Sequence, residues 1–166
     1  MNIRKAAPGD LPRLLEIYND EVSTGTATFD TQPRSCEAGR RWMEAHSADG
    51  RPLCVAQEEG EILGYVSLSD YNPKAAYAGT VELSLYIARA HRGRGVGTAL
   101  MEFILTYARS HDSLHTVVSL ITAGNDASLR LHERFGFRHM GTLYEAGYKF
   151  GRLLDVEYYQ IILHHQ

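Results

Sequence analysis

The sequence holds only two cysteines, Cys36 and Cys54, among its 166 residues. Their positions match no metal-ligand spacing, and a small disulfide-stabilised secreted domain would hold more, so we expect free thiols, a reducing compartment and no metal site. No apolar run reaches the roughly 18 residues that a membrane span needs, and the first residues lead into no signal-like apolar stretch. A cytoplasmic protein without a membrane partner is therefore expected.

An excess of charge of one sign is also missing. The formal net charge is −3, and the basic residues are scattered outside one short loop, which argues against a nucleic-acid partner held by phosphate contacts. With 44% hydrophobic and 22% charged residues, the composition is that of an ordinary globular protein. The chain shows no repeat, linker or low-complexity tract, so its length predicts a single domain over residues 1–166.

Glycine and arginine are concentrated in one place, between residues 91 and 98. The loop follows a strand-like run, residues 81–87, and precedes apolar residues at helical spacing from Val96 onward. Its members are Arg92, Gly93, Arg94, Gly95, Val96, Gly97 and Thr98. Glycines let backbone N–H groups approach a ligand at the positive end of a helix, which suits a pyrophosphate. The order of glycines fits neither the dinucleotide fingerprint nor a Walker loop, and a plain glycine-rich turn with solvated arginines stays an alternative.

The apolar periodicity predicts alternating strands and helices. The expected strands are residues 2–6, 52–56, 62–68, 81–87, 116–121, 137–143 and 153–163. The expected helices begin near Asp10, Ser35, Val96 and Asn125. The segments 24–33, 70–79 and 144–151 are expected to be loops. The last strand places Leu154, Val156, Tyr158, Gln160 and Ile162 on one face.

A second motif follows the glycine loop. It runs from Asn125 through Ser128, Leu131 and His132 to Gly136-Phe137. Together the two motifs resemble the acetyl-CoA site of the GNAT-superfamily N-acetyltransferases, in which the glycine loop holds the pyrophosphate and the Asn and Ser bind the pantetheine arm or the phosphates. The resemblance also assigns the backbone N–H groups of Leu85, Tyr86 and Ile87 to the pantetheine, with core packing as the alternative role for the Tyr86 ring.

Across essentially the whole chain the sequence resembles the phosphinothricin and methionine-sulfoximine acetyltransferase branch. The matching segments are 17–19, 28–33, 80–87, 131–133, and Lys149-Phe150-Gly151 with Leu154-Asp155-Val156. The resemblance implies an α/β (α+β) GNAT fold, with a mixed, mostly antiparallel sheet of about seven strands flanked by about four helices. It further implies acetyl-CoA as co-substrate, a small-molecule amine as partner, and a homodimer.

Glu82 is the candidate general base. A thioester is attacked only by a neutral amine, whereas an ordinary amine is mostly ammonium at neutral pH, so the site needs a proton acceptor. Glu82 lies in the otherwise apolar run that leads into the glycine loop. Burial there would raise the pKa of its carboxyl group. The alternative is a solvent-facing or arginine-paired Glu82, and the branch's carboxylate at this position favours the catalytic role.

His132 is the second catalytic candidate. It lies four residues after Ser128 and seven after Asn125, so the three share one helical face. A lone histidine on a short helix is usually structural, but the branch places one where many GNAT enzymes carry a tyrosine that protonates the thiolate. The sequence leaves open whether His132 acts as acid, base or orienter.

The substrate-binding candidates lie on segments that resemble the branch's pocket. They are Phe29, Asn72, Lys74, Glu82, Leu83 and Ser84. The branch often carries an arginine near Asn72, which suits a bidentate carboxylate or phosphinate contact, and Lys74 supplies only a point charge. We therefore expect acetylation of the α-amine of a small amino-acid-like compound. The alternatives are an acetyltransferase for a polyamine or a peptide N-terminus, and a regulatory acetyl-CoA-binding module without turnover.

Overall fold

The structure is a computed structural model that describes residues 1–163. Its centre is a seven-stranded sheet with the strand order β1-β2-β3-β4-β5-β7-β6. The strands are β1 (Asn2–Lys5), β2 (Leu53–Glu58), β3 (Glu61–Asp70), β4 (Thr80–Ile87), β5 (Thr116–Thr122), β6 (Arg138–Lys149) and β7 (Arg152–Ile162). All neighbouring pairs are antiparallel except β4 and β5. The predicted mixed, mostly antiparallel sheet is confirmed.

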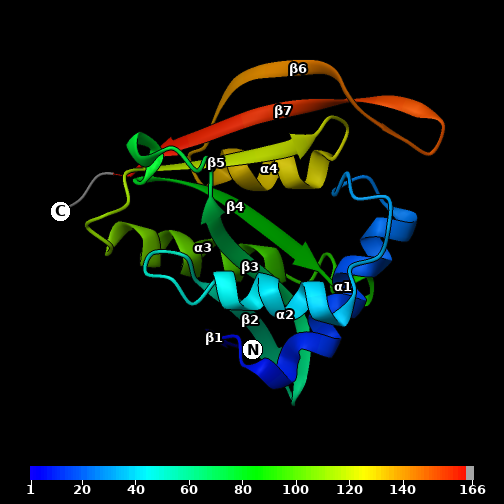
Figure 1. Cartoon of the computed structure of the whole chain (residues 1–166), viewed down its shortest axis with the longest axis vertical. Helices are drawn as coiled ribbons and strands as arrows, with labels where there is room; N and C mark the ends of the chain where they lie inside the picture. Colours follow the sequence, from blue (N-terminus) through cyan, green and yellow to red (C-terminus); the bar gives the residue numbers. More distant parts are fainter. Residues whose placement is uncertain (164–166) are drawn as a thin grey trace.

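Four α-helices cover the two faces of this sheet (Figure 1) in the described part of the chain. They are α1 (Leu11–Thr24), α2 (Cys36–Ala45), α3 (Val96–Arg109) and α4 (Asp126–Arg134), with short 3₁₀ turns at Pro8–Asp10, Ala75–Tyr77 and Arg89–His91. The Ser35 side chain caps α2 by accepting a hydrogen bond from the Ala38 N–H at 3.1 Å. None of these helices is both long and apolar enough to cross a membrane.

The sheet separates two groups of buried side chains because alternate residues of a strand point to opposite faces. On one face, Val55 and Tyr65 pack with Leu14 of α1. On the other, Val66 packs with Leu100 and other buried residues of α3. The helix α3 is therefore the central one, and it presents fully buried side chains to β2, β3 and β4.

The strands β4 and β5 are paired only at their beginnings. Parallel strands need a crossover connection, and here α3 provides it. The paired residues are Thr80↔Thr116, Val81↔Val117 and Glu82↔Val118. Beyond Glu82 the two strands diverge, as Figure 1 shows in the centre of the molecule. This divergence opens the sheet where the functional candidates lie.

The predicted strands and helices are present, but the end of the chain differs from expectation. Residues 144–151 were expected to form a loop, and instead β6 continues to Lys149. Glycine, tyrosine and lysine suggested a loop, whereas β6 is an edge strand with an irregular pairing between Leu143 and Gly147, where Glu145 has a φ of 52°. Edge strands tolerate such bulges and polar residues.

The buried face of β7 also changes along the strand. Leu154 and Val156 are buried, as their alternation predicted, but Ile162 on that same face is 49% exposed. Tyr159, on the opposite face, is buried, and its hydroxyl group donates a hydrogen bond to Glu133 of α4 at 2.9 Å. The helix α4 covers that face of β7. Tyr159 is therefore buried by its contact with α4, although the alternation placed the buried residues on the other face.

Candidate active site

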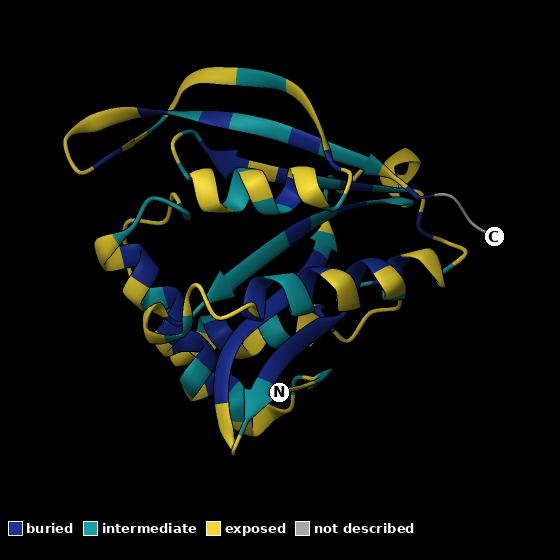
Figure 2. Cartoon of the chain, turned by 180° about the vertical axis from the view of Figure 1, so that it is seen from behind, coloured by how far each residue is buried: buried dark blue, intermediate teal, exposed yellow. Residues whose placement is uncertain are grey.

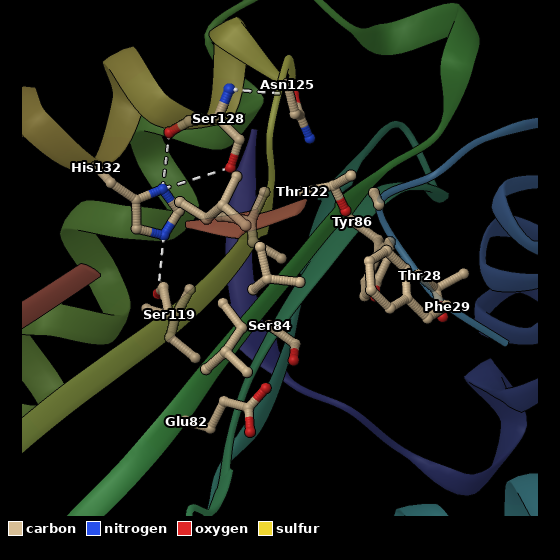
Figure 3. A pocket seen from close by; sticks show the side chains of 16 residues that line it. Thr28, Phe29, Glu82, Ser84, Tyr86, Ser119, Thr122, Asn125, Ser128 and His132 are labelled. Atoms are coloured by element: carbon tan, nitrogen blue, oxygen red, sulfur yellow. Dashed lines mark hydrogen bonds between the residues drawn. The ribbon is translucent and has the colours of Figure 1, made fainter. Parts of the chain in front are cut away.

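The divergence of β4 and β5 leads into a cavity of about 270 Å³. Figure 3 shows side chains from β4, β5, α4 and the segment that follows α1 around it. The lining includes Thr28, Phe29, Glu82, Leu83, Ser84, Leu85, Tyr86, Ser119, Thr122, Asn125, Ser128 and His132. The fold therefore brings both predicted catalytic residues to one cavity, although they are far apart in the sequence.

Glu82 lies on β4 at the last paired position before the strands diverge. Its side chain is partly buried, and burial raises the pKa of its carboxyl group above the usual range. No ion pair between Glu82 and a cation occurs within residues 1–163. The arginine-paired alternative is therefore excluded for this part of the chain, and Glu82 has the environment of a proton acceptor.

The ring nitrogens of His132 on α4 have three hydrogen-bond partners, one of which is Oγ of Ser128 at 3.4 Å from Nδ1. Nδ1 also lies 2.8 Å from the backbone oxygen of Ser128, and Nε2 lies 2.9 Å from Oγ of Ser119 on β5. The ring is 3% exposed and contacts Phe137 edge-on. Burial lowers the pKa of the imidazole below its usual value, so His132 is neutral near pH 7.

Asn125 and Ser128 form the beginning of α4. The Asn125 side chain accepts a hydrogen bond from the Ser128 N–H at 3.3 Å, which is an N-cap. Both residues line the cavity. Their position allows contact with a ligand between β4 and α4, and the N-cap gives Asn125 a structural role as well.

The glycine loop leads directly into α3. Gly93 and Gly95 have φ values of 74° and 82°, which other residues rarely adopt, and no atom lies within 4 Å of the position of an added Cβ. Gly95 is the N-cap of α3, and no side chain caps the helix. The first N–H groups of α3 thus have no side-chain cap at the positive end of the helix, which fits the pyrophosphate of acetyl-CoA.

Gly97 has a different role from the other two glycines. An added Cβ would lie 3.0 Å from Ile87 and 3.3 Å from Leu131. Gly97 therefore lets α3 approach β4 and α4 closely. Val96 is buried beside it, and the Thr98 hydroxyl accepts a hydrogen bond from Arg134 of α4.

Both arginines of the loop form ion pairs. Arg92 forms an ion pair with Glu21 of α1 at 3.0 Å, and Arg94 forms one with Glu58 at 3.2 Å. The side chains of both arginines are about half exposed, at 51% and 52%. These ion pairs fix the loop against α1 and the β2–β3 hairpin, and the exposed guanidinium groups can still contact an anion.

The part of β4 beyond Glu82 has no strand partner on the side of β5. Leu85, Tyr86 and Ile87 lie there, so their backbone is available for a ligand that adds to the free edge. The Tyr86 ring packs edge-on against Tyr18, with the ring centres 5.4 Å apart. The packing alternative for that ring is therefore confirmed.

The predicted substrate-binding residues fall into two groups. Phe29, Leu83 and Ser84 line the cavity. Asn72 and Lys74 lie in the loop before β4, outside the cavity lining, where the Asn72 side chain accepts a hydrogen bond from the Lys74 N–H at 3.0 Å. The structure therefore does not bring these two residues to the cavity that contains Glu82.

The segment that carries Phe29 is held by residues that sequence reasoning did not select for this purpose. The Thr122 hydroxyl donates to the Thr26 oxygen at 2.5 Å, and the buried Lys149 ammonium group donates to the Thr28 oxygen at 2.9 Å. Gly147 of β6 lies against the Phe29 ring, so closely that an added Cβ would overlap it. The end of β6 thus packs behind the segment that carries Phe29.

Ser119 and Thr122 were missed as site residues, and a signal for them exists. Both are buried polar residues in the apolar strand β5, the pattern that identified Glu82 in β4. Ser119 is 1% exposed. What the sequence could not show is that β5 borders the cavity.

No cluster of three or more metal-ligating side chains occurs in the described chain.

These features define the class of the protein. A parallel strand pair that diverges beside a glycine loop and a helix N-terminus, with a buried carboxylate in the gap, is the arrangement that the acetyltransferase resemblance implies. The Acetyltransferase (GNAT) family profile matches residues 12–137, and the chain belongs to this family of enzymes.

Two curated relatives cover nearly the whole chain. The L-methionine sulfoximine/L-methionine sulfone acetyltransferase of Pseudomonas paraeruginosa is 40% identical over 98% of this chain and 94% of its own length. The phosphinothricin N-acetyltransferase of Streptomyces coelicolor is 40% identical over 96% of this chain and 95% of its own.

Two solved structures show the same fold. A putative acetyltransferase from Salmonella typhimurium with its cofactor acetyl-CoA has a TM-score of 0.94 at 33% identity, covering 99% of this chain and 95% of its own. A ribosomal-protein-alanine N-acetyltransferase from Brucella melitensis has a TM-score of 0.94 at 39% identity, covering 98% and 100%. The expected fold and family are confirmed.

Proposed function

We propose that this enzyme transfers the acetyl group of acetyl-CoA to the α-amine of a small amino-acid-like substrate of the methionine sulfone, methionine sulfoximine or phosphinothricin type. The observation that carries the proposal is the partly buried Glu82 carboxyl group, without an ion-pair partner in the described chain, at the cavity where β4 and β5 diverge. The curated relatives with these activities support the substrate class. The retained Glu82 and His132 argue against a module without turnover.

Acetyl-CoA supplies an activated acetyl thioester when bound. Its pyrophosphate is assigned to the loop Arg92–Thr98, and its pantetheine arm to the free edge of β4 at residues 85–87, beside Asn125 and Ser128. The backbone N–H groups on this edge also polarise the thioester carbonyl. Glu82 accepts the proton of the substrate ammonium group, because its raised pKa lies closer to that of an amine than an ordinary carboxylate's does.

The acceptor side combines hydroxyl groups with the Phe29 ring. Thr28 and Ser84 line the cavity beside Phe29, which suits a short polar side chain with a tetrahedral sulfur or phosphorus centre. The Lys149 ammonium group already donates to the Thr28 oxygen, so it positions the wall and adds positive charge. Because Asn72 replaces an arginine of the branch, phosphinothricin is expected to be a poorer substrate than methionine sulfone.

A substrate panel tests this proposal. We expect a thiol-release assay to favour methionine sulfone and methionine sulfoximine over spermidine, aminoglycosides and short peptides by at least about tenfold in kcat/KM, or ~1.4 kcal/mol in transition-state binding. Peptides with an N-terminal alanine belong in the panel because of the Brucella melitensis relative. A preference for a peptide or a polyamine would contradict the amino-acid substrate and leave the acetyltransferase class intact.

We also propose a single-domain, cytoplasmic homodimer. Both cysteines are free thiols, which suits a reducing compartment. The edge strand β6 and its turn expose apolar side chains, and much of the outer strand has the colour of exposed residues in Figure 2. These apolar side chains include Met140, Leu143, Tyr144, Tyr148 and Phe150. An exposed apolar edge favours pairing with another chain, and the mass by light scattering tests it: a monomer at assay concentration would contradict the dimer.

A further inference from the structure

Ser119 is the polar side chain closest to the His132 ring on the β5 side. It is 1% exposed, lines the cavity, and its Oγ lies 2.9 Å from His132 Nε2. Figure 3 shows the ring pointing from α4 toward β5, with the Ser119 hydroxyl at its lower nitrogen. A buried hydroxyl in an apolar strand is retained at a cost unless it is hydrogen-bonded, and here its partner is the candidate catalytic histidine.

The hydrogen bonds of His132 determine its tautomer. The backbone oxygen of Ser128 can only accept, so Nδ1, at 2.8 Å, carries the proton. In the neutral ring Nε2 is then an acceptor, and the Ser119 O–H donates to it. His132 consequently has no N–H of its own to offer to the cavity. A proton that enters or leaves the ring at Nε2 passes through Ser119 Oγ.

We propose that Ser119 is a proton-relay residue that connects the reacting atoms to His132. This inference rests on the proposed acetyl transfer and adds a group to it. In this proposal His132 does not protonate the thiolate directly. It accepts a proton from the Ser119 hydroxyl group and later returns it. The proposal stands on the hydrogen bond from Nδ1 to the backbone oxygen of Ser128, on the hydrogen bond between Nε2 and Ser119, and on the shared cavity.

The relay moves protons between the adduct, Ser119 and His132 during one turnover. Glu82 first takes one proton from the substrate ammonium, and attack on the thioester carbon forms the C–N bond. The amine nitrogen of the resulting tetrahedral adduct then gives a proton to Ser119 Oγ while the Ser119 proton moves to His132 Nε2. When the C–S bond breaks, the Ser119 proton moves to the departing thiolate and the Nε2 proton returns to Ser119. The products are the amide and the free thiol. Ser119 and His132 are restored, and Glu82 returns to its carboxylate form by releasing its proton to the solvent.

The surroundings of the ring suit this exchange. Phe137 and the Tyr159 ring pack against it from the side of β6 and β7, and Glu133 and Arg134 are its charged neighbours on α4. The Glu82 carboxylate borders the same cavity from β4. Burial keeps the imidazole neutral and able to accept a proton near pH 7. The adduct's ammonium is a stronger acid than the free ammonium, which eases its transfer of a proton to the relay.

A matched pair of variants isolates the hydroxyl group. Ser119→Thr keeps the hydroxyl group. Ser119→Val has the same shape as the threonine variant but carries a methyl group in place of the hydroxyl. In single-turnover assays with acetyl-CoA and methionine sulfone, we expect the acetyl-transfer rate of Ser119→Val to fall ~100-fold, the lower end for a lost proton-transfer group, and that of Ser119→Thr to stay within about fivefold of wild type. The acetyl-CoA affinity of both variants, measured by calorimetry, is expected to be unchanged.

A second readout separates a relay from packing. Measured in mixtures of light and heavy water, the wild-type rate is expected to depend on deuterium content along a curve, because two protons move together, and the Ser119→Val rate along a straight line. Nitrogen NMR of the wild-type histidines should show the Nδ1–H tautomer for His132. This measurement needs no variant, so it stands even if Ser119→Val does not fold.

Several results would overturn the relay. These are a Ser119→Val rate equal to that of Ser119→Thr, a straight-line dependence in the wild type, or an Nε2–H tautomer of His132. A wild-type enzyme that transfers no acetyl group to any amine of the panel would instead contradict the proposed function. Wild-type turnover with an unaffected Ser119→Val variant would contradict the relay alone.

Discussion

The part of the proposed site assigned to acetyl-CoA, called here the donor side, and the part assigned to the amine substrate, called the acceptor side, are built in different ways. Most of the donor side is one continuous piece of chain, from β4 through the glycine loop into α3, to which the start of α4 is added. The acceptor side is assembled from the segment after α1, the strand β5 and the end of β6, which are far apart in the sequence. A site built from one segment depends on local backbone geometry, whereas a site built from several depends on packing between them.

The carboxylate of Glu21 links the two sides. Glu21 of α1 pairs with Arg92 of the glycine loop at 3.0 Å, and its other carboxylate oxygen accepts a hydrogen bond from the Ala27 N–H at 3.0 Å. The carboxylate is thus shared between the donor loop and the segment that carries Phe29. The comparison predicts that changes in the loop affect acetyl-CoA binding first, and that changes at the end of β6 affect the acceptor alone.

The largest effect is expected from Gly95→Asp. The substitution puts a side chain and a negative charge at the N-terminus of α3, where the pyrophosphate is assigned, and the residue must keep a φ of 82°. Calorimetry is expected to show no measurable binding of acetyl-CoA.

Gly60→Asp is the matched control for this variant. Gly60 also has a positive φ, 86°, and no atom lies within 4 Å of an added Cβ, but it lies in the β2–β3 turn. It therefore introduces the same strain and charge away from the helix N-terminus. Unchanged acetyl-CoA affinity in a folded Gly95→Asp variant would contradict the assignment of the donor side.

The second-largest effect is expected from Glu82→Gln, on β4. Loss of a general base is expected to lower kcat by ~10²–10⁴ with acetyl-CoA affinity nearly intact. Since the pKa of Glu82 is raised by burial, the wild-type kcat should fall as the pH decreases through that raised value. Wild-type kcat in Glu82→Gln between pH 6 and 9 would mean that the amine loses its proton in another way.

The free energy of unfolding of Glu82→Gln tests separately whether burial affects the Glu82 carboxyl group. A carboxyl group with a raised pKa binds its proton more tightly in the folded state, so its contribution to stability is present below the pKa of the unfolded chain and lost as the pH rises through the folded pKa. Glu82→Gln should therefore have a higher free energy of unfolding than wild type at pH 7, with the difference vanishing near pH 4. Urea titrations at the two pH values measure it.

Gly147→Ala should have the smallest effect and change the acceptor side alone. The new methyl group overlaps the Phe29 ring, and overpacking costs about 1–3 kcal/mol. Part of this strain is expected to shift the ring and raise KM for methionine sulfone ~10-fold, while the acetyl-CoA affinity stays unchanged.

A double-variant cycle checks the cause of that effect. If Gly147 acts through Phe29, then Gly147→Ala adds no further loss in a Phe29→Ala background. Additive losses would mean that the end of β6 acts through another contact, such as that between Lys149 and the Thr28 oxygen. A change in acetyl-CoA affinity would show that the two sides are not separable.

The sequence alone determined the glycine loop, the start of α3 and most of the fold. Strand alternation, helical spacing and the glycines at 93 and 95 are local signals, and the structure places the loop, the N-cap of α3 and the capping Asn125 where they indicated. Glu82 was identified as a carboxylate in an apolar strand and by the resemblance to a branch that carries a carboxylate at this position. Such features depend on residues within a few positions of each other.

Only the tertiary structure decided the acceptor side. It showed that Asn72 and Lys74 lie outside the cavity, that residues 144–149 continue the edge strand, and that Lys149 and Gly147 hold the segment around Phe29. It also joined Ser119 to His132 across two elements. These contacts connect residues far apart in the chain, and no periodicity or spacing encodes them, because they depend on how β5, β6 and α4 pack after the sheet has formed.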